Sequence, residues 1–415
     1  MNLHPMQTRS KSRIIKKKVF LASVHSAAEV DLTTIEPSTY KSALKVPVWY
    51  SAIQEKIVAL HSQDTWSLVD LPPNKNLFVK YVGAGIVILL LYVDDIIITG
   101  SAAATIQQVI AQLTKEFELK DLGPLHFFLG IQITRTASGL FLSQEKYIQD
   151  LLKKSDMLDS KPAVTPCLPY NWLLKDDGQP FNNPSLYKNI VGALQYLVFT
   201  RPDIVFSVHQ VSQFMQVPMI YHFTAVKRIL RYLKGSLTHG IRYSSGELIL
   251  KAFSDADWAR NPNDRWSTTG LVVFLGNNPI AWSSKKQQTV SRSSTEAEYR
   301  ALSSTAAELD WVQQLLTFLK IQLESTPVLF CDNMSAIALS FNPVQHQRTK
   351  HIEVDVHFVR EQVAHKNLLV QFVSSSEQFA DILTKGLSSP LFTTHCSNLM
   401  LGSSQPELEG GCKSI

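Results

Sequence analysis

The chain alternates short apolar runs, typical of strands, with longer stretches in which apolar residues recur every three or four positions, typical of helices. The most apolar stretch, residues 86–101 with the sequence IVILLLYVDDIIITGS, sets β-branched runs on both sides of Asp94 and Asp95. It predicts two strands that meet at a tight turn carrying two adjacent carboxylates. The apolar run from Val82 to Val93 is too short to cross a bilayer core, so we expect no membrane association.

Two interpretations of the Asp94 and Asp95 turn stay open at this point. Carboxylates on a rigid hairpin can hold Mg²⁺ with little reorganisation, and this ion prefers one or two carboxylates together with substrate phosphates. Asp is also a favoured turn residue where no ligand binds. The turn alone therefore does not decide between a metal site and a plain connection.

In the rest of the first 246 residues, the spacing of apolar residues predicts several helices, one hairpin and a linker. Helices are predicted from Trp49, at 102–117, at 144–154, and at 187–233, where Pro202 and Pro218 cut the helix into pieces. Between the second and third helices, the runs FFLGIQI and GLFLSQ predict a hairpin. Residues 160–184 form a linker because they carry five prolines, at positions 162, 166, 169, 180 and 184.

Residues 247–387 have the pattern of one complete small domain. Three short strands, ELILKAFSD, TGLVVFLG and PIAWSS, predict an antiparallel meander, and a long helix at 293–320 follows. The strands PVLFC and NLLVQFV then alternate with three more helices. Strands joined by crossover helices predict an α/β (α+β) fold, with a mixed sheet flanked by helices. The polar tail from Ser388 predicts a loose segment.

Composition, charge, cysteine spacing and the N-terminal pattern each add an expectation. The 415 residues leave room for several domains, and 45% hydrophobic residues suit globular folding. The net charge of +5 is concentrated in the first 18 residues, which suits either a polyanionic partner or a solvated basic tail. The four cysteines form no CxxC or Cys/His pattern, so we expect neither disulfides nor zinc. Without a signal-peptide core near the N-terminus, we expect an intracellular location, cytoplasm or nucleus unspecified.

Two basic segments are candidates for binding a phosphate backbone. The predicted helix around AVKRILRYLKG turns its cations mostly away from its apolar face, and the segment HQRTKH precedes another helix. Ordinary solvated charge is the alternative for both segments. The candidate residues are Lys227, Arg228, Arg231, Lys234, Arg348, Lys350 and His351, with His346 as a further substrate-contact residue.

Several segments together resemble the Pol polyprotein of copia-type LTR retrotransposons. They are LLLYVDDIIITGS, LGPLHFFLGIQI, YKNIVGALQYLVFTRPDI, KRILRYLKG, SDADWA, SSTEAEYRAL and RTKHIEVDVHFVRE, in this order. The resemblance implies a truncated reverse transcriptase palm and thumb followed by ribonuclease H. It also makes Asp94 and Asp95 the remnant of the polymerase metal site.

The resemblance breaks at Asn76 to Leu77, where the family has the rest of the fingers and the strand with its first catalytic Asp. It therefore implies that polymerase activity is absent. The expected parts are a basic arm with a fingers remnant (1–76), palm and thumb (77–159), a linker and helical connection (160–246), ribonuclease H (247–387) and a loose tail (388–415).

Four acids stand where a nuclease site is expected. Asp255 and Asp332 end two strands, Glu298 lies in the first turns of the long helix, and Asp381 opens the last helix. Ligands gather beyond the carboxyl ends of strands in such sheets, so these acids can converge. Two Mg²⁺ ions roughly 4 Å apart, with Mn²⁺ as a substitute, could then activate water and stabilise the leaving oxygen.

Each of these acids also has a structural alternative. Asp332 could cap a helix, Asp257 could replace Asp255, and Asp381 could complement a helix dipole. Glu298 heads the stripe Leu302, Thr305, Leu309, Val312 and Leu316, so we predict that it faces the core. Glu296 heads the line Tyr299, Arg300 and Ser303, which we predict to be mostly solvated, and it has capping-box spacing from Ser293.

The sequence thus favours a Mg²⁺-dependent ribonuclease H that cleaves RNA in RNA/DNA hybrids, joined to an incomplete polymerase. The alternative is a non-catalytic retroelement relic that at most binds nucleic acid. No small-molecule substrate is indicated, and the sequence does not specify an oligomeric state.

Overall fold

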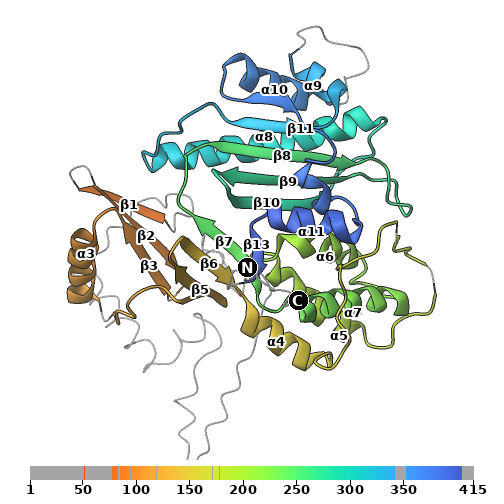
Figure 1. Ribbon diagram of the computed structural model, residues 1–415, viewed down its shortest axis with the longest axis horizontal. Coiled ribbons are helices and arrows are strands. Elements are labelled where there is room, and N and C mark those ends of the chain that lie inside the picture. The colour runs from red at the N-terminus through yellow and green to blue at the C-terminus, as the bar shows by residue number, and fades with distance from the viewer. Residues whose placement is uncertain are drawn as a thin grey trace, which may run out of the picture. The chain divides into compact units, whose positions relative to one another are not determined.

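The computed structural model describes residue 51 and residues 77–403, apart from 83–84, 94, 118, 171, 177 and 342–351. The chain divides into two compact units, with the boundary between Asp121 and Leu122 (Figure 1). The fingers remnant, Asp94, His346, Arg348, Lys350 and His351 lie outside the described residues. None of the described helices combines the length and apolar character needed to cross a membrane.

The first unit contains a three-stranded antiparallel sheet and one helix. Strands β1 (Leu77–Val82), β2 (Gly85–Tyr92) and β3 (Asp95–Gly100) pair in the order β1-β2-β3, and helix α3 (Ala103–Glu116) follows. The predicted hairpin is confirmed, with Tyr92 opposite Asp95 across its turn. Val93 in this turn has φ 54°, the left-handed conformation that a tight hairpin requires.

Apolar burial is sparse in this unit. Among its described residues, Val87 is the one buried hydrophobic side chain, and Phe78, Tyr81 and Tyr92 are at least 40% exposed. Helix α3 has the predicted phase, since Ile106, Val109, Ile110 and Leu113 are its half-buried apolar residues, but none of its residues is fully buried. Within the described residues, this sheet therefore has far less buried apolar surface than the second unit.

A five-stranded antiparallel sheet begins the second unit. Its strands are β4 (Phe127–Phe128), β5 (Ile131–Thr136), β6 (Gly139–Ser143), β7 (His239–Ser244) and β13 (Leu401–Ser403), in the order β13-β7-β6-β5-β4. The predicted hairpin of β5 and β6 is confirmed. Gly139 has φ 152°, and a Cβ there would lie 2.0 Å from the carbonyl oxygen of Tyr243, so this position requires glycine.

The C-terminal segment corrects the prediction of a loose tail from Ser388. Residues Ser389–Asn398 form helix α11, and β13 then pairs with β7. Phe392, Leu399 and Leu401 are buried, and the ring of Phe392 packs 5.5 Å from that of Tyr232. Tertiary burial of these scattered apolar residues outweighs the polar composition of the segment.

Helices α4 (Glu145–Lys154), α5 (Pro184–Leu197), α6 (Val205–Ser212) and α7 (Ile220–Gly235) form the helical part of this unit, with the 3₁₀ turn η2 (Pro202–Ile204) before α6. The breaks predicted at Pro202 and Pro218 are confirmed. Their apolar faces belong to one core that extends from Ile148 to Leu401 and includes Phe253 and Phe274. The core is thus continuous across the boundaries expected at 160, 247 and 388.

A buried ion pair lies within this core. Arg201 and Asp203 are 0% and 2% exposed, and the guanidinium donates to both carboxylate oxygens at 3.0 and 2.7 Å. Arg201 also donates to Ser236 at the end of α7, and the Tyr232 hydroxyl donates to Asp203 at 2.5 Å. These bonds satisfy both charges, and they tie the start of α6 to the end of α7.

The second sheet of this unit is mixed. Strands β8 (Leu250–Asp257), β9 (Thr268–Leu275), β10 (Asn278–Lys286), β11 (Val328–Cys331) and β12 (Leu369–Phe372) take the order β10-β9-β8-β11-β12. β8, β9 and β10 form the predicted antiparallel meander, whereas β11 is parallel to both β8 and β12. This confirms the mixed α/β arrangement predicted for residues 247–387.

Both faces of the mixed sheet are covered. Leu250 and Ala252 face the core shared with α8 (Ser294–Phe318), α9 (Met334–Phe341) and α10 (Glu353–Ala364). Phe253 faces the other core, which includes Ile382 and Leu383 of the 3₁₀ helix η4 (Phe379–Leu383). Because neighbouring residues of a strand point to opposite faces, the sheet separates the two cores.

The contrast in burial predicts how the two units resist proteolysis. We expect trypsin to cleave first before residue 122, because the first unit holds few buried apolar side chains, and a fragment containing residues 122–403 to persist. N-terminal sequencing and mass spectrometry of the products would identify the sites. Early cleavage within 250–385 would contradict this expectation.

The buried ion pair predicts a large stability loss on Arg201→Met. The substitution leaves the Asp203 carboxylate buried without its partner, which costs about 3–5 kcal/mol of unfolding free energy. The matched control is Glu353→Gln, which breaks the exposed pair with His357 and should cost at most about 1 kcal/mol. Urea unfolding measures both changes, and equal losses would show that burial of the pair has no special effect.

Candidate functional site

The parallel pairing of β8 and β11 brings Asp255 and Asp332 to the same end of the mixed sheet. Val328, Leu329 and Phe330 pair with Lys251, Ala252 and Phe253. Continuing this register by two residues aligns Asp332 with Asp255. Asp255 is 4% exposed, whereas Asp332 just beyond the strand is partly exposed. Both acids thus stand at the carboxyl edge of their strands, as predicted.

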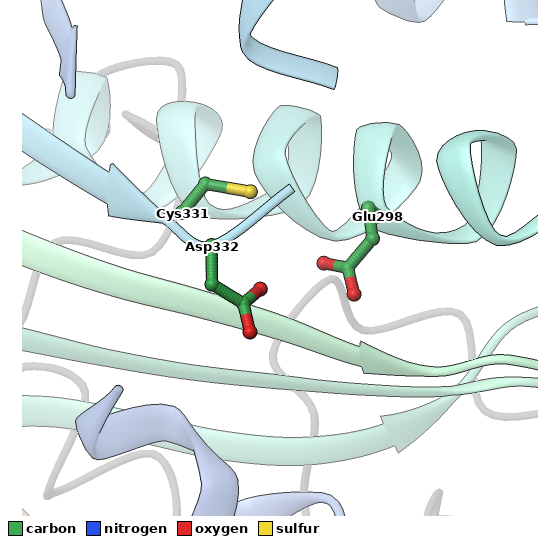
Figure 2. Close-up of side chains that lie close together, drawn as sticks. All are labelled: Glu298, Cys331 and Asp332. Carbon is green, nitrogen blue, oxygen red and sulfur yellow. The ribbon is translucent and has the colours of Figure 1, made fainter. Parts of the chain in front are cut away.

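Glu298 reaches the same edge from α8. It is 7% exposed, and the backbone N–H of Ala256 in β8 donates to its carboxylate. Its second oxygen, Oε2, is buried and has no hydrogen-bond partner in the part of the chain that the structure describes. Figure 2 shows the carboxylate of Glu298 projecting from α8 toward the end of β11, where Asp332 and Cys331 lie. The predicted core-facing stripe below Glu298 is confirmed, since all five residues are buried.

Glu296 has the structural role that its spacing predicts. Its backbone N–H is capped by Ser293 Oγ at 3.2 Å, its carboxylate accepts from the backbone N–H of Arg292 at 2.9 Å, and it pairs with Arg300 at 2.9 Å. The prediction of a mostly solvated line was wrong, because Tyr299 and Ser303 are buried. They are covered from the α10 side, where Asp355 accepts a hydrogen bond from Ser303.

Asp381 joins the cluster from η4 and brings a cation with it. Lys385 Nζ lies 2.8 Å from Asp381 Oδ1 and 3.9 Å from Asp255 Oδ2. Thr384 donates its hydroxyl to Asp255. Sequence reasoning missed Thr384 and Lys385, although they follow Asp381 by three and four residues, a spacing that places side chains on one helical face.

The acids perturb one another because they are buried together. Burial, followed by the charges of Asp255 and Asp332, raises the pKa of Glu298 to about 9. Burial and Asp255 raise the pKa of Asp381 to about 7, and the same two causes raise the pKa of Asp332. Burial alone would lower the pKa of Lys385, but Asp255 and Asp381 outweigh it and raise that pKa. Excess negative charge at one buried point favours cation binding.

The structure also tests the structural alternatives for these acids. Asn333, and not Asp332, caps α9, since its Oδ1 accepts from the backbone N–H of Ala336 at 3.0 Å. Asp257 pairs with Arg260 at 3.3 Å, whereas Asp255 contacts Thr384 and Lys385 within the cluster. Asp381 likewise contacts a side chain of the cluster. The four predicted acids, and not their alternatives, therefore come together.

Cys331 was not among the predicted site residues. It is fully buried at the end of β11, and its sulfur and the carboxylate oxygens of Glu298 and Asp332 all lie within 4.8 Å of one another (Figure 2). The sequence offered a signal in the pair Cys331-Asp332, which ends a strand. That signal was overlooked because cysteine was considered only in CxxC and Cys/His patterns.

Three of the four cations predicted to bind phosphate on α7 form hydrogen bonds within the protein. Arg228 donates to Thr165 Oγ1 at 2.9 Å, Arg231 donates to the carbonyl oxygen of Lys161 at 2.6 Å, and Lys234 donates to the carbonyl oxygen of Leu158. These bonds hold the proline-rich segment against the helix. Lys227 is the exposed member of the four, and its ammonium lies 5.1 Å from the ring centroid of Phe223.

Asp95, the described member of the predicted polymerase pair, is the exposed first residue of β3. Its partner Asp94 is outside the described residues, so the geometry of this pair stays a prediction.

Comparisons with known proteins address the family. The family described as "Reverse transcriptase (RNA-dependent DNA polymerase)" matches residues 34–169. The chain is 46% identical over 352 residues to the retrovirus-related Pol polyprotein from transposon RE1 of Arabidopsis thaliana, covering 85% of this chain and 24% of that protein. It thus spans about a quarter of the length of this relative.

A shorter relative is covered more fully. The putative transposon Ty5-1 protein YCL074W of Saccharomyces cerevisiae is 32% identical over 238 residues, which is 56% of this chain and 77% of that protein. Among solved structures, the N-terminal RNase H domain of rv2228c from Mycobacterium tuberculosis is 16% identical, with a TM-score of 0.25, and covers 36% of this chain and 98% of the other.

The ordered motifs from LLLYVDDIIITGS to RTKHIEVDVHFVRE predicted one family, and the sequence relatives confirm it over most of the chain. The chain therefore belongs to the Pol polyproteins of copia-type retrotransposons.

Proposed function

We propose that residues 250–385 form a Mg²⁺-dependent ribonuclease H site that cleaves the RNA strand of RNA/DNA hybrids. The observation that carries the proposal is the convergence of Asp255, Glu298, Asp332 and Asp381 from four separate elements. Among the described residues Lys385 is the cation paired with these acids, and a largely buried group of acids is costly unless it binds further cations.

The donor set suits the proposed ion. Mg²⁺ prefers oxygen ligands and is held by a few carboxylates together with substrate phosphates. Glu298 Oε2 is buried and has no hydrogen-bond partner among the described residues, so it fits a metal ligand. Asp255, Glu298, Asp332 and Asp381 would hold the ions. Bound there, Mg²⁺ would supply a more acidic water and stabilise charge on the leaving oxygen.

The protein's own residues prepare the site. Thr384 fixes one oxygen of Asp255 by donating its hydroxyl, so that carboxylate is oriented before any ion binds. The Ala256 backbone N–H orients Glu298 in the same way. Lys385 partly neutralises Asp255 and Asp381, which lets these acids stay close together. Preorganisation of this kind reduces the reorganisation that ligand binding would otherwise require.

The central test compares the two glutamates at the start of α8. Glu298→Gln should abolish Mg²⁺-dependent cleavage of a labelled RNA/DNA hybrid while the far-ultraviolet circular dichroism is unchanged, because the amide removes a metal ligand. Glu296→Gln should retain cleavage and cost about 1–2 kcal/mol of stability, since it loses cap and ion-pair contacts.

Loss of cleavage in the Glu296 variant alone would contradict this assignment. A folded chain that cleaves no hybrid in Mg²⁺ or Mn²⁺ would instead support the non-catalytic alternative.

The raised pKa values predict a pH dependence of stability. In the folded chain the pKa of Glu298 is raised from its ordinary value of 4.5 to about 9. The pKa of Asp381 is raised from 3.8 to about 7. At pH values between the ordinary and the raised pKa of each group, the folded chain therefore binds more protons than the unfolded chain. The free energy of unfolding consequently falls as the pH rises through this range. The slope is about 1.4 kcal/mol per pH unit for each proton that only the folded state holds.

Urea unfolding in EDTA between pH 5 and 8 measures this slope. Glu298→Gln should flatten it, because the amide does not titrate, and saturating Mg²⁺ should flatten it in the unsubstituted chain, because the ion stabilises the ionised acids. A slope that neither change reduces would mean that the four acids do not control it.

A further inference from the structure

The carboxylate cluster contains a soft donor that a magnesium site does not need. Cys331 ends β11 and is fully buried, and its sulfur lies within 4.8 Å of carboxylate oxygens of both Glu298 and Asp332. Figure 2 shows the three side chains gathered between α8 and the end of β11. Mg²⁺ takes oxygen ligands and leaves such a sulfur unused.

This donor set matches a different class of ion. Zinc accepts one thiolate and two carboxylates, at about 2.3 Å to sulfur and about 2.0–2.2 Å to oxygen, and three protein ligands leave a fourth position open for water. Tetrahedral bonds of that length put the ligand atoms about 3.5 Å apart, so small side-chain rotations from separations within 4.8 Å suffice. Cadmium, a larger thiophilic ion, needs still less movement.

A second observation, separate from the position of the sulfur, also suits a metal ligand. Glu298 is 7% exposed, and among the described residues its buried Oε2 has no hydrogen-bond partner. The Cys331 sulfur accepts a backbone N–H from Asn333 at 3.4 Å, which orients it without occupying its remaining lone pair. Asp332 is partly exposed and gives an ion a route from solvent.

We propose that Glu298, Cys331 and Asp332 bind a thiophilic divalent cation of the Zn²⁺ or Cd²⁺ class. On binding, the Cys331 S–H bond breaks, its proton leaves to solvent, and a metal–sulfur bond forms, with no change of oxidation state. Binding of the ion therefore releases protons, and the apparent affinity rises with pH.

The proposal goes beyond the ribonuclease function and does not require it. The two sites share Glu298 and Asp332, so a thiophilic ion and Mg²⁺ would compete for the same carboxylates. The sulfur gives the thiophilic ion one ligand that Mg²⁺ cannot use, and selectivity therefore depends on Cys331.

Cadmium binding tests the site directly, because a cadmium–thiolate bond absorbs in the ultraviolet. The test uses the full chain with Cys167, Cys396 and Cys412 replaced by serine, which leaves Cys331 as the single thiol. Titration with Cd²⁺ alone should produce this band and saturate at one ion per chain. Adding Cys331→Ser to the same background should remove the band.

Glu298→Gln in the single-thiol background separates this site from a lone thiol. It keeps Cys331 but removes a carboxylate, and the Cd²⁺ affinity should fall about tenfold or more. Circular dichroism before each titration confirms that every variant is folded. Absence of the band in the folded single-thiol chain, or unchanged affinity in the Glu298 variant, would overturn the proposal. The Cd²⁺ titration does not depend on hybrid cleavage, so a chain that cleaves no hybrid could still show the cadmium–thiolate band.

Discussion

The parallel pairing of β8 with β11 is the constraint on which the candidate site depends. Its register aligns Asp332 with Asp255, two acids that are far apart in sequence. Pairing with β9 in the antiparallel meander holds β8 in the sheet. The chain then leaves β10, passes through α8 and returns as β11 beside β8. A shift of this register by one residue would turn Phe330 and Cys331 to the wrong faces and separate the acids.

The acids collected by that pairing work against stability. Burial raises the pKa of Glu298 and of Asp381, which means that the folded chain holds their ionised forms at a cost. Lys385, Thr384 and the Ala256 backbone N–H offset part of that cost. Well-packed apolar residues at these positions would avoid that cost, so the cluster lowers stability relative to an apolar core, as the proposed cation site requires.

The buried ion pair of Arg201 and Asp203 contrasts with this cluster. There each nitrogen of the Arg201 guanidinium donates to Asp203 or Ser236, and the Tyr232 hydroxyl donates to Asp203. Among the described residues Glu298 Oε2 has no such partner. One buried polar group is thus satisfied by the protein's own side chains, whereas the other is left with an unpaired oxygen on the opposite face of the mixed sheet.

Local periodicity determined much of this structure. Alternating apolar residues were sufficient to predict the β2–β3 hairpin and the meander, and the stripe from Leu302 to Leu316 was sufficient to orient α8. The capping spacing from Ser293 identified the structural role of Glu296. Such patterns are readable because each residue's environment follows from the repeat of its own element. The positions of the four acids at strand and helix ends followed from the same patterns, and their convergence is decided by the sheet order.

Only the tertiary structure decided the features that depend on distant partners. Helix α11 and strand β13 form because Phe392 and Leu401 are buried against elements far away in sequence, which polar composition does not reveal. Arg228 and Arg231 bind the proline-rich segment, although charge spacing favoured a solvated or phosphate-binding face. Lys385 and Cys331 join the acids only once η4 and β11 meet beside β8. Sequence specifies the period of each element, whereas long-range packing selects its partner.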